Sequence, residues 1–347
     1  MEVDIGRTYQ RMENQKFASI EGYSHISTVV GKAQAMMDKV RSGEIKPLQT
    51  SLRKEQEKIG GYYPSDQVVI AGRTGTGKSA KMLSDILDFC NVDINPTYQD
   101  DMIILLDSYE MADWRNVLRM ISRRGEVEAK ALLDYAKRLT EERYKFLRDI
   151  GEQFRHLPIY ITNKPLKPSA WEEQKKQIQG KFPKKKIVNV YDHSRLGLKE
   201  DDVKKEEEHI SGLMFRGIYL KNNFDMLMFW LSQMNRNIET NISRDKLGTY
   251  LPVASDIFGS DAVFQCADVV YALHRPGMYK VAEFEGIPTG YDPERPEKND
   301  HLLLEVVLKQ REGWTGNLLL GHNLAHNKVY DLELVPPSRQ LTTESDF

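Results

Sequence analysis

A glycine-rich loop lies in the first third of this chain and consists of Gly72-Arg73-Thr74-Gly75-Thr76-Gly77-Lys78-Ser79. Every position matches the pattern G-x-x-x-x-G-K-[ST], whose glycines let backbone N–H groups close around phosphate oxygens. An apolar run, 67–71, precedes the loop, and a segment with helical spacing, 80–87, follows it. Strand, loop and helix form the setting that the motif requires. The whole loop, 72–79, is therefore predicted to bind ATP.

Two side chains of this loop have specific predicted roles. Lys78 is expected to reach the outer phosphates, and the Ser79 hydroxyl is expected to hold Mg²⁺. The N-terminus of the following helix adds its positive end. The alternative is a glycine turn that contains Lys-Ser by coincidence.

Composition favours a cytoplasmic protein with one large domain, or a domain with an appendage. The 347 residues are 40% hydrophobic and carry a net charge of −2, which gives no global attraction to nucleic acid. The first residues lack the basic head and apolar run of a signal peptide. The most apolar window, 226–231, is far too short to span a bilayer, so no membrane partner is expected.

A domain boundary is predicted near residue 45. The polar segment 1–23 is expected to form an arm, and apolar residues at helical spacing predict one amphipathic helix over 26–42. Residues 46–347 form the main domain. The helix either packs on its own domain or docks on a neighbouring subunit, and its periodicity alone does not decide between these partners.

Beyond residue 67, short apolar runs alternate with longer amphipathic ones. This alternation predicts an α/β fold with a mostly parallel sheet and helices on both faces. Strands are expected at 67–72, 102–107, 157–162, 187–191, 225–231 and 268–273. Helices are expected at 78–90, 112–122, 128–137, 140–154, 168–179 and 201–222. Runs at 302–308 and 317–320 predict an antiparallel C-terminal extension, after an exposed loop at 286–300.

Three polar residues at the ends of predicted strands are candidates for work on the nucleotide. Asp192 ends a strand, and an Asp at the end of a strand beside the phosphate-loop strand is the Walker-B arrangement for Mg²⁺. Glu110 follows another strand, where it would polarise the attacking water, and Gln233 follows a third, where it would contact the γ-phosphate. The alternatives are that Asp192 and Glu110 cap the segments after them and that Gln233 satisfies backbone groups.

Two cations far along the chain, Lys309 and Arg311, lie two apart on a predicted strand. Side chains at that spacing point the same way, which suits two charges directed at one phosphate of a neighbouring protomer. The alternative is an exposed, solvated pair.

Two loops after core strands are candidates for contact with single-stranded DNA. The first, 193–202, carries Arg195, and the second, 237–254, carries Arg244 and Lys246. The second loop is favoured because it follows Gln233 directly and could couple nucleotide state to DNA grip. The alternative is an ordinary exposed loop.

In combination, these motifs resemble the RecA-like motor domain of DnaB-type replicative DNA helicases, including bacteriophage versions. Asp107-Ser108-Tyr109-Glu110-Met111 is similar to the family's Ser-Leu-Glu-Met element, and Leu231-Ser232-Gln233-Met234-Asn235-Arg236 is similar to its Leu-Ser-Gln-Leu-Asn-Arg. Lys309-Gln310-Arg311-Glu312-Gly313 is similar to its Lys-x-Arg-x-Gly. The resemblance runs in order from about residue 46 to 335.

This resemblance implies an ATP-dependent DNA helicase, a six-membered ring that moves along single-stranded DNA and unwinds duplex. It implies that Lys78, Ser79 and Asp192 bind phosphate and Mg²⁺, that Glu110 activates water and that Gln233 senses the γ-phosphate. It further implies that Lys309 and Arg311 act in trans and that 26–42 is a linker helix docking on the adjacent subunit. The family's large N-terminal domain, which contacts primase and braces the ring, is missing here, and a companion protein is expected to supply ring stability and loader contacts. A primase or loader protein is an expected partner. A viral version would act in the host cytoplasm.

Two departures from the family stand out. The family has an aromatic or hydrophobic residue and then a Gln after the Walker-B Asp, whereas this chain has His193-Ser194-Arg195, and Trp314 replaces the usual Pro. Two other interpretations stay open: a recombination ATPase like RecA or RadA, and a KaiC-like or loader-type ATPase switch that does not unwind DNA.

Overall fold

The computed structural model describes residues 20–98, 101–134, 139–244, 250–292, 294, 300–311 and 313–333. The chain divides into two compact units, Met1–Lys46 and Pro47–Phe347. The roles expected for these two parts stay predictions. Among the described residues, none of the helices has the length and apolar character that a membrane span requires.

The first unit contains the helix α2 (Ile26–Ser42), at the bounds that the sequence predicts. Its N-terminus is capped by His25, whose Nδ1 accepts a hydrogen bond from the backbone N–H of Ser27, and Gly43 ends it in the left-handed conformation at φ 75°. No residue of α2 is buried. Its larger apolar side chains are all exposed: Ile26, Val29, Val30, Met36, Met37 and Val40.

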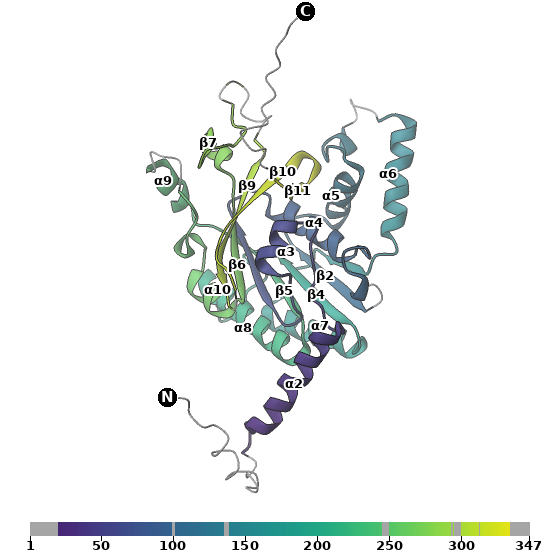
Figure 1. The fold of residues 1–347 in the computed structure, drawn as a ribbon, viewed down its shortest axis with the longest axis vertical. Helices are drawn as coiled ribbons and strands as arrows, with labels where there is room; N and C mark the ends of the chain where they lie inside the picture. The colour runs from purple at the N-terminus through teal and green to yellow at the C-terminus, as the bar shows by residue number, and fades with distance from the viewer. Residues whose placement is uncertain are drawn as a thin grey trace, which may run out of the picture. The chain divides into compact units, whose positions relative to one another are not determined.

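Within the described residues of the second unit, nine strands form one sheet in the order β11-β10-β9-β6-β1-β5-β4-β2-β3 (Figure 1). The strands are β1 (Gln67–Gly72), β2 (Met102–Ser108), β3 (Ile159–Thr162), β4 (Lys186–Asp192), β5 (Leu227–Gln233), β6 (Val269–His274), β9 (Leu302–Gln310), β10 (Gly316–Asn323) and β11 (Lys328–Asp331). Strands β1 to β6 pair in parallel, and β9, β10 and β11 pair antiparallel. The predicted fold class and C-terminal extension are therefore confirmed.

Helices cover both faces of the sheet because successive strand residues point to opposite faces. One core holds Val68 and Ile70 of β1 together with Ile86 of α4. The other holds Val69 and Ala71 together with Leu213 of α8. The first face carries α3 (Arg53–Ile59), α4 (Lys78–Phe89) and α5 (Asp113–Gly125), with α6 (Glu141–Phe154) on α5; the second carries α7 (Pro168–Lys181), α8 (Glu206–Phe224) and α10 (Ser260–Cys266).

Several sequence predictions differ from the structure in detail. The helix predicted over 128–137 is wrong in its described part, where only a 3₁₀ turn, Ala131–Leu133, forms. The helix predicted from residue 201 begins at Glu206. Helix α9 (Asn237–Arg244) lies within the predicted loop 237–254, and a short hairpin of β7 (Glu283–Phe284) and β8 (Ile287–Pro288) reaches into the predicted loop 286–300.

A buried charged cluster connects α4 to β9. The Lys81 ammonium lies 2.7 Å from Asp85 and 3.2 Å from Glu55, and 3.9 Å from the Glu305 carboxylate. All four side chains are almost completely buried, and among the described residues neither carboxylate oxygen of Glu305 has a hydrogen-bond partner. Burial, reinforced by the Glu55 carboxylate, raises the pKa of Glu305 well above its usual value. Burial therefore favours the protonated form of Glu305.

Candidate active site

The strand ends that carry the predicted site residues meet at one edge of the sheet. Gly72 of β1 stands opposite Gln233 of β5, and Ser108 of β2 stands opposite Asp192 of β4. Strand β4 does not lie beside β1 as expected, because β5 separates them. All these residues nevertheless lie at the carboxyl ends of adjacent parallel strands, where ligands of open α/β sheets bind.

At Gly77, the phosphate loop adopts a backbone conformation that only glycine takes without strain. Gly77 has φ 100° and caps the N-terminus of α4. A Cβ atom on Gly77 would lie 2.8 Å from Cδ2 of Leu324, so the residue also allows close packing against the turn after β10. The Thr76 hydroxyl donates to the Arg73 carbonyl at 2.8 Å. The loop is therefore closed by its own residues.

The Lys78 side chain folds back over this loop. Its Nζ donates to the Gly72 carbonyl at 2.7 Å and to the Arg73 carbonyl at 3.1 Å. Burial lowers the pKa of Lys78 to about 8, although the Asp192 and Glu110 carboxylates act in the opposite direction. A bound triphosphate would add negative charge here and so favour the protonated amine.

Ser79 and Asp192 form the predicted Mg²⁺ pair. The Ser79 hydroxyl donates to Oδ2 of Asp192 at 2.9 Å. Burial raises the pKa of Asp192 to about 6, and the Ser79 hydrogen bond partly offsets that rise. A hydroxyl and a carboxylate at this distance, beside a phosphate loop, supply the oxygen ligands that Mg²⁺ prefers. The residues present therefore fit the ion.

Three further side chains lie together beside this pair. His193 Nε2 lies 3.2 Å from Nε2 of Gln233 and 4.0 Å from Oε2 of Glu110. The Glu110 side chain is 49% exposed, so water can reach it. Burial lowers the pKa of His193, which favours the neutral ring. The structure thus brings Glu110 and Gln233 to the same site and adds His193 between them.

Arg195 also belongs to this neighbourhood. It pairs with Glu206, with Nη2 at 2.8 Å from Oε2 and Nε bonded to Oε1. Its Nη1 lies 3.4 Å from Oε1 of Gln233, and its guanidinium lies 4.4 Å from the centroid of the Phe258 ring. These contacts give the side chain partners within the protein, and its contact with DNA stays a prediction.

Asp107 lies near the end of β2, the strand that Glu110 follows, and is not available to a ligand. Its carboxylate accepts hydrogen bonds from Lys175 Nζ, Trp171 Nε1 and Asn189 Nδ2, each at 2.9 Å. Its side chain is 1% exposed. This aspartate therefore stabilises the core between β2, β4 and α7.

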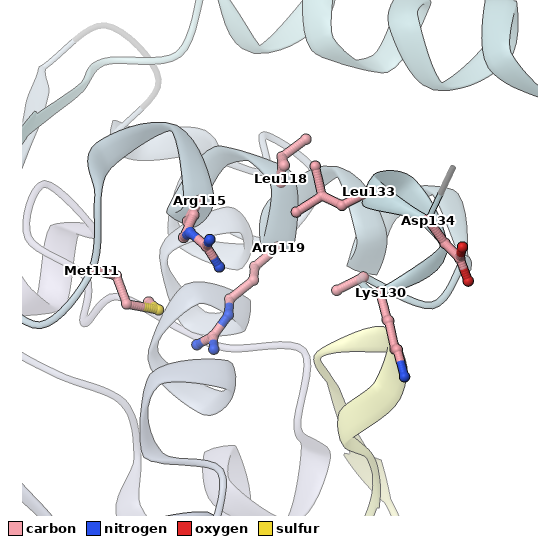
Figure 2. A pocket seen from close by; sticks show the side chains of 8 residues that line it. Met111, Arg115, Leu118, Arg119, Lys130, Leu133 and Asp134 are labelled. Carbon is pink, nitrogen blue, oxygen red and sulfur yellow. The ribbon is translucent and has the colours of Figure 1, made fainter. Parts of the chain in front are cut away.

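A basic cavity next to the site was not foreseen from the sequence. It has a volume of about 540 Å³ and is lined by Met111, Arg115, Leu118, Arg119, Ala129, Lys130, Leu133 and Asp134. Figure 2 shows Arg115 and Arg119 extending from α5 toward the side where Met111 lies. The Arg119 charge acts to lower the pKa of Asp192, against the larger effect of burial. Arg115 and Arg119 are four residues apart and therefore share one face of α5. Their spacing, in the helix that follows Glu110, is the sequence signal that could have predicted this basic cavity.

Lys309 and Arg311 lie at the opposite edge of the sheet. Lys309 stands opposite Val270, near the start of β6, and its ammonium donates to the Phe264 carbonyl. Arg311 lies 3.2 Å from Asp268. The premise that both lie on one strand is wrong, because β9 ends at Gln310 and Arg311 follows in a turn.

This edge is too far from the chain's own phosphate loop for contact. Asp268, the partner of Arg311, accepts from the backbone N–H of Gln67 at 2.8 Å, at the first residue of β1. The phosphate loop begins at the other end of β1, roughly 17 Å away at about 3.3 Å per residue. An arginine side chain does not span that distance.

The favoured DNA loop is described only in part. Lys246 and the side chain of Arg244 lie outside the described residues. The helix that starts the loop, α9, is joined to the phosphate loop: Arg73 Nε donates to Glu239 Oε1 at 2.9 Å, and Arg73 Nη1 donates to the Met234 carbonyl at 3.2 Å. A change in the phosphate loop can therefore reach α9 directly.

Comparison with known proteins identifies the family. The model of the DnaB-like helicase C-terminal domain matches residues 47–331. The chain belongs to this family. The replicative DNA helicase DnaB of Geobacillus stearothermophilus is 24% identical over 294 residues, which cover 84% of this chain and 58% of the relative. The replicative DNA helicase DnaC of Bacillus subtilis is 24% identical over 339 residues, which cover 96% of this chain and 65% of the relative. The chain thus spans about three fifths of the length of these DnaB-type relatives.

Solved structures show the same DnaB-like fold. One of them, an ATPase domain, superposes with a TM-score of 0.73 at 20% identity, and the match covers 90% of this chain and 100% of that domain. A DnaB-like replicative helicase, solved in a study of its interactions with primase, superposes with a TM-score of 0.71 at 19% identity. That match covers 94% of this chain and 71% of the helicase. The RecA-like architecture predicted from the motifs is confirmed.

Proposed function

We propose that the protein is an ATP-dependent replicative DNA helicase, a ring-forming motor, with a hexamer as its working form, that moves along single-stranded DNA and unwinds duplex. One observation carries this proposal. The phosphate loop and the Ser79–Asp192 pair lie at one edge of the sheet, and Lys309 and Arg311 lie at the other. The relatives of this chain are named replicative DNA helicases. The proposed place of action is the cytoplasm, or that of the host if the protein is viral.

The hydrolysis step is assigned to residues around the phosphate loop. The loop backbone and Lys78 hold the β- and γ-phosphates, and Glu110 accepts the proton of the attacking water. Gln233 contacts the γ-phosphate, and Arg119 adds positive charge on the side of Asp192.

Ser79 and Asp192 are the proposed Mg²⁺ ligands, with Asp192 bound directly or through water. When bound, Mg²⁺ supplies positive charge to the phosphate oxygens. The raised pKa of Asp192 is consistent with a buried carboxylate that lacks a full positive partner in the protein alone.

Lys309 and Arg311 are proposed to complete the site of a neighbouring protomer. Their distance from the chain's own loop leaves a second copy as the source of a phosphate. The exposed apolar face of α2 is proposed to pack on a neighbouring protomer, as the linker helix of the ring.

Single-stranded DNA is the proposed polymer substrate, and a primase or loader protein is a proposed partner. The loop 237–254, with Arg244 and Lys246, is proposed to contact the DNA backbone. The hydrogen bonds from Arg73 to Glu239 of α9 and to the Met234 carbonyl before it support this choice, because they connect the nucleotide loop to the start of the DNA loop.

The test is steady-state ATP hydrolysis with and without single-stranded DNA, followed by unwinding of a forked duplex. We expect Mg²⁺-dependent hydrolysis, several-fold stimulation by single-stranded DNA, and strand separation. Hydrolysis without stimulation or unwinding would favour a nucleotide-driven assembly switch. Stimulated hydrolysis with strand exchange in place of unwinding would favour a recombination ATPase.

A further inference from the structure

The loop after the Walker-B aspartate contains an arginine whose contacts are all within the protein. Arg195 forms a two-point ion pair with Glu206, the first residue of α8, and stacks 4.4 Å from the centroid of the Phe258 ring. Its side chain is 33% exposed. A two-point pair and a stacked guanidinium fix both the position and the plane of the group.

The fixed guanidinium determines which way the amide of Gln233 faces. Arginine has only N–H donors, so its Nη1, 3.4 Å away, selects the carbonyl oxygen of the amide. The amide nitrogen is then turned to the other side, where it lies 3.2 Å from Nε2 of His193. Glu110 lies near the same nitrogen of His193, with Oε2 at 4.0 Å. The N–H donors of Gln233 therefore face the side of the water-activating carboxylate.

We infer that Arg195, anchored by Glu206, is a positioning residue for ATP hydrolysis that holds the amide of Gln233 with its N–H donors toward the γ-phosphate. This inference rests on the proposed function. Without Arg195 the amide can rotate by half a turn, since its two ends are nearly equal in size. The carbonyl oxygen would then face the phosphate oxygens and be repelled by them.

The charges around Arg195 favour this role over a contact with DNA. Glu206, Glu207 and Glu208 form the first turn of α8, beside the guanidinium. Glu206 neutralises Arg195, and the charge of the turn repels an approaching DNA phosphate. A contact with a DNA phosphate needs a surface cation that is not neutralised by a carboxylate, whereas Arg195 is already paired with Glu206.

The test compares four single variants and one double variant: Arg195→Ala, Glu206→Gln, Gln233→Ala, the control Arg216→Ala, and Arg195→Ala combined with Gln233→Ala. Arg216 is the matched control because its side chain is also 33% exposed and pairs with glutamates, Glu172 and Glu200, that have no proposed role in hydrolysis. The measurements are kcat and KM for ATP, Kd for single-stranded DNA at several salt concentrations, and Tm.

We expect Arg195→Ala to lower kcat about 10-fold, the size of one lost polar contact in a transition state, with KM and Kd changed less than about 2-fold. Glu206→Gln is expected to lower kcat about 3-fold, since the guanidinium loses its anchor and keeps its hydrogen bond. In the Gln233→Ala background, Arg195→Ala should have no further effect, because it acts through the amide.

Three results would overturn the inference. One is a kcat of Arg195→Ala equal to that of Arg216→Ala. Another is an additive loss in the double variant. The third is weaker DNA binding by Arg195→Ala with a salt slope lower by about 1 and unchanged basal hydrolysis, together with tighter DNA binding by Glu206→Gln, which would identify a DNA contact. If Arg195→Ala lowers Tm strongly, Glu206→Gln decides, since it keeps the packing, and a kcat of Glu206→Gln equal to that of Arg216→Ala would overturn the inference. Absence of hydrolysis by the unmodified protein would instead contradict the proposed function.

Discussion

The two edges of the parallel sheet differ in what they offer a phosphate. At the carboxyl edge, Lys78, Ser79 and Asp192 contact one another or the loop backbone and enclose a site within one chain. At the amino edge, Asp268 holds Arg311 at 3.2 Å and also accepts from Lys221 and from the Gln67 backbone. The carboxyl edge therefore holds a nearly complete nucleotide site. The amino edge holds cationic side chains that are paired with the carboxylate of Asp268.

This difference bears on where a phosphate at the amino edge would come from. A phosphate arriving at the amino edge would compete with Asp268 for Arg311, whose side chain is 55% exposed. A carboxylate partner keeps the arginine extended in the absence of a neighbour and adds a cost to its transfer. The amino edge therefore suits a contact that forms only when two copies meet.

The largest effect is expected from the amino edge. Arg311→Ala should lower the kcat of ATP hydrolysis about 10³-fold, the lower end of the range for a cation supplied in trans, while nucleotide affinity stays nearly constant. Steady-state kinetics and binding of a fluorescent ATP analogue measure the two quantities. Arg53→Ala is the control, since Arg53 is an exposed arginine paired only weakly with Glu57, at 3.9 Å. Full turnover in Arg311→Ala would contradict action in trans.

The carboxyl edge should respond differently. Lys78→Ala should lower kcat/KM at least about 100-fold and also weaken nucleotide binding, because the lysine contacts the phosphate in both the ground and transition states. An equal mixture of Lys78→Ala and Arg311→Ala should regain hydrolysis, since about a quarter of randomly formed interfaces join an intact loop to an intact arginine. A mixture as inactive as its components would show that the two edges do not meet between subunits.

The smallest effect concerns the buried cluster that connects α4 to β9 through Lys81 and Glu305. The folded-state pKa of Glu305 is raised, so its stabilising contribution is complete below about pH 4.3, the ordinary value for Glu, and is lost as pH rises toward the raised value. Glu305→Gln cannot ionise and should remove this loss, which for one proton is at most about 1.4 kcal/mol per pH unit.

The measurement is the free energy of unfolding in urea from pH 5 to 9, with the exposed Glu57→Gln as control. The Glu305→Gln profile should be flatter than that of the unmodified protein, and the variant should be the more stable of the two at pH 9. A parallel profile, shifted down at every pH, would mean that Glu305 is ionised in the fold.

The sequence predicted the parts of the molecule that depend on local pattern. The phosphate loop, the six parallel strands and the Ser79–Asp192 pair follow from spacing and from residue types at strand ends. Strand order did not follow, because nothing local shows that β5 separates β4 from β1. The helix expected over 128–137 failed for a related reason: its described part is held by contacts to distant segments, such as the hydrogen bond from Ala129 N–H to the Ala325 carbonyl at 2.9 Å.

The site shows the same limit. Their places at the ends of predicted strands made Glu110 and Gln233 candidates, but the positions of His193 and Arg195 between and beside them depend on how the strand ends converge. The burial of Asp107 depends on Lys175 and Trp171 of α7, which lie far along the chain from it. Burial and pairing of this kind are properties of the assembled core, which a single sequence pattern does not contain.

The packing of Leu324 against Gly77 has a consequence for biogenesis. The leucine is synthesised long after the glycine, so this contact forms only when nearly the whole domain has left the ribosome. A nascent chain that stalls before this turn has the full phosphate-binding motif but lacks the Leu324 side chain that packs against Gly77. Affinity for nucleotide is therefore expected to increase once the residues after β10 join the fold.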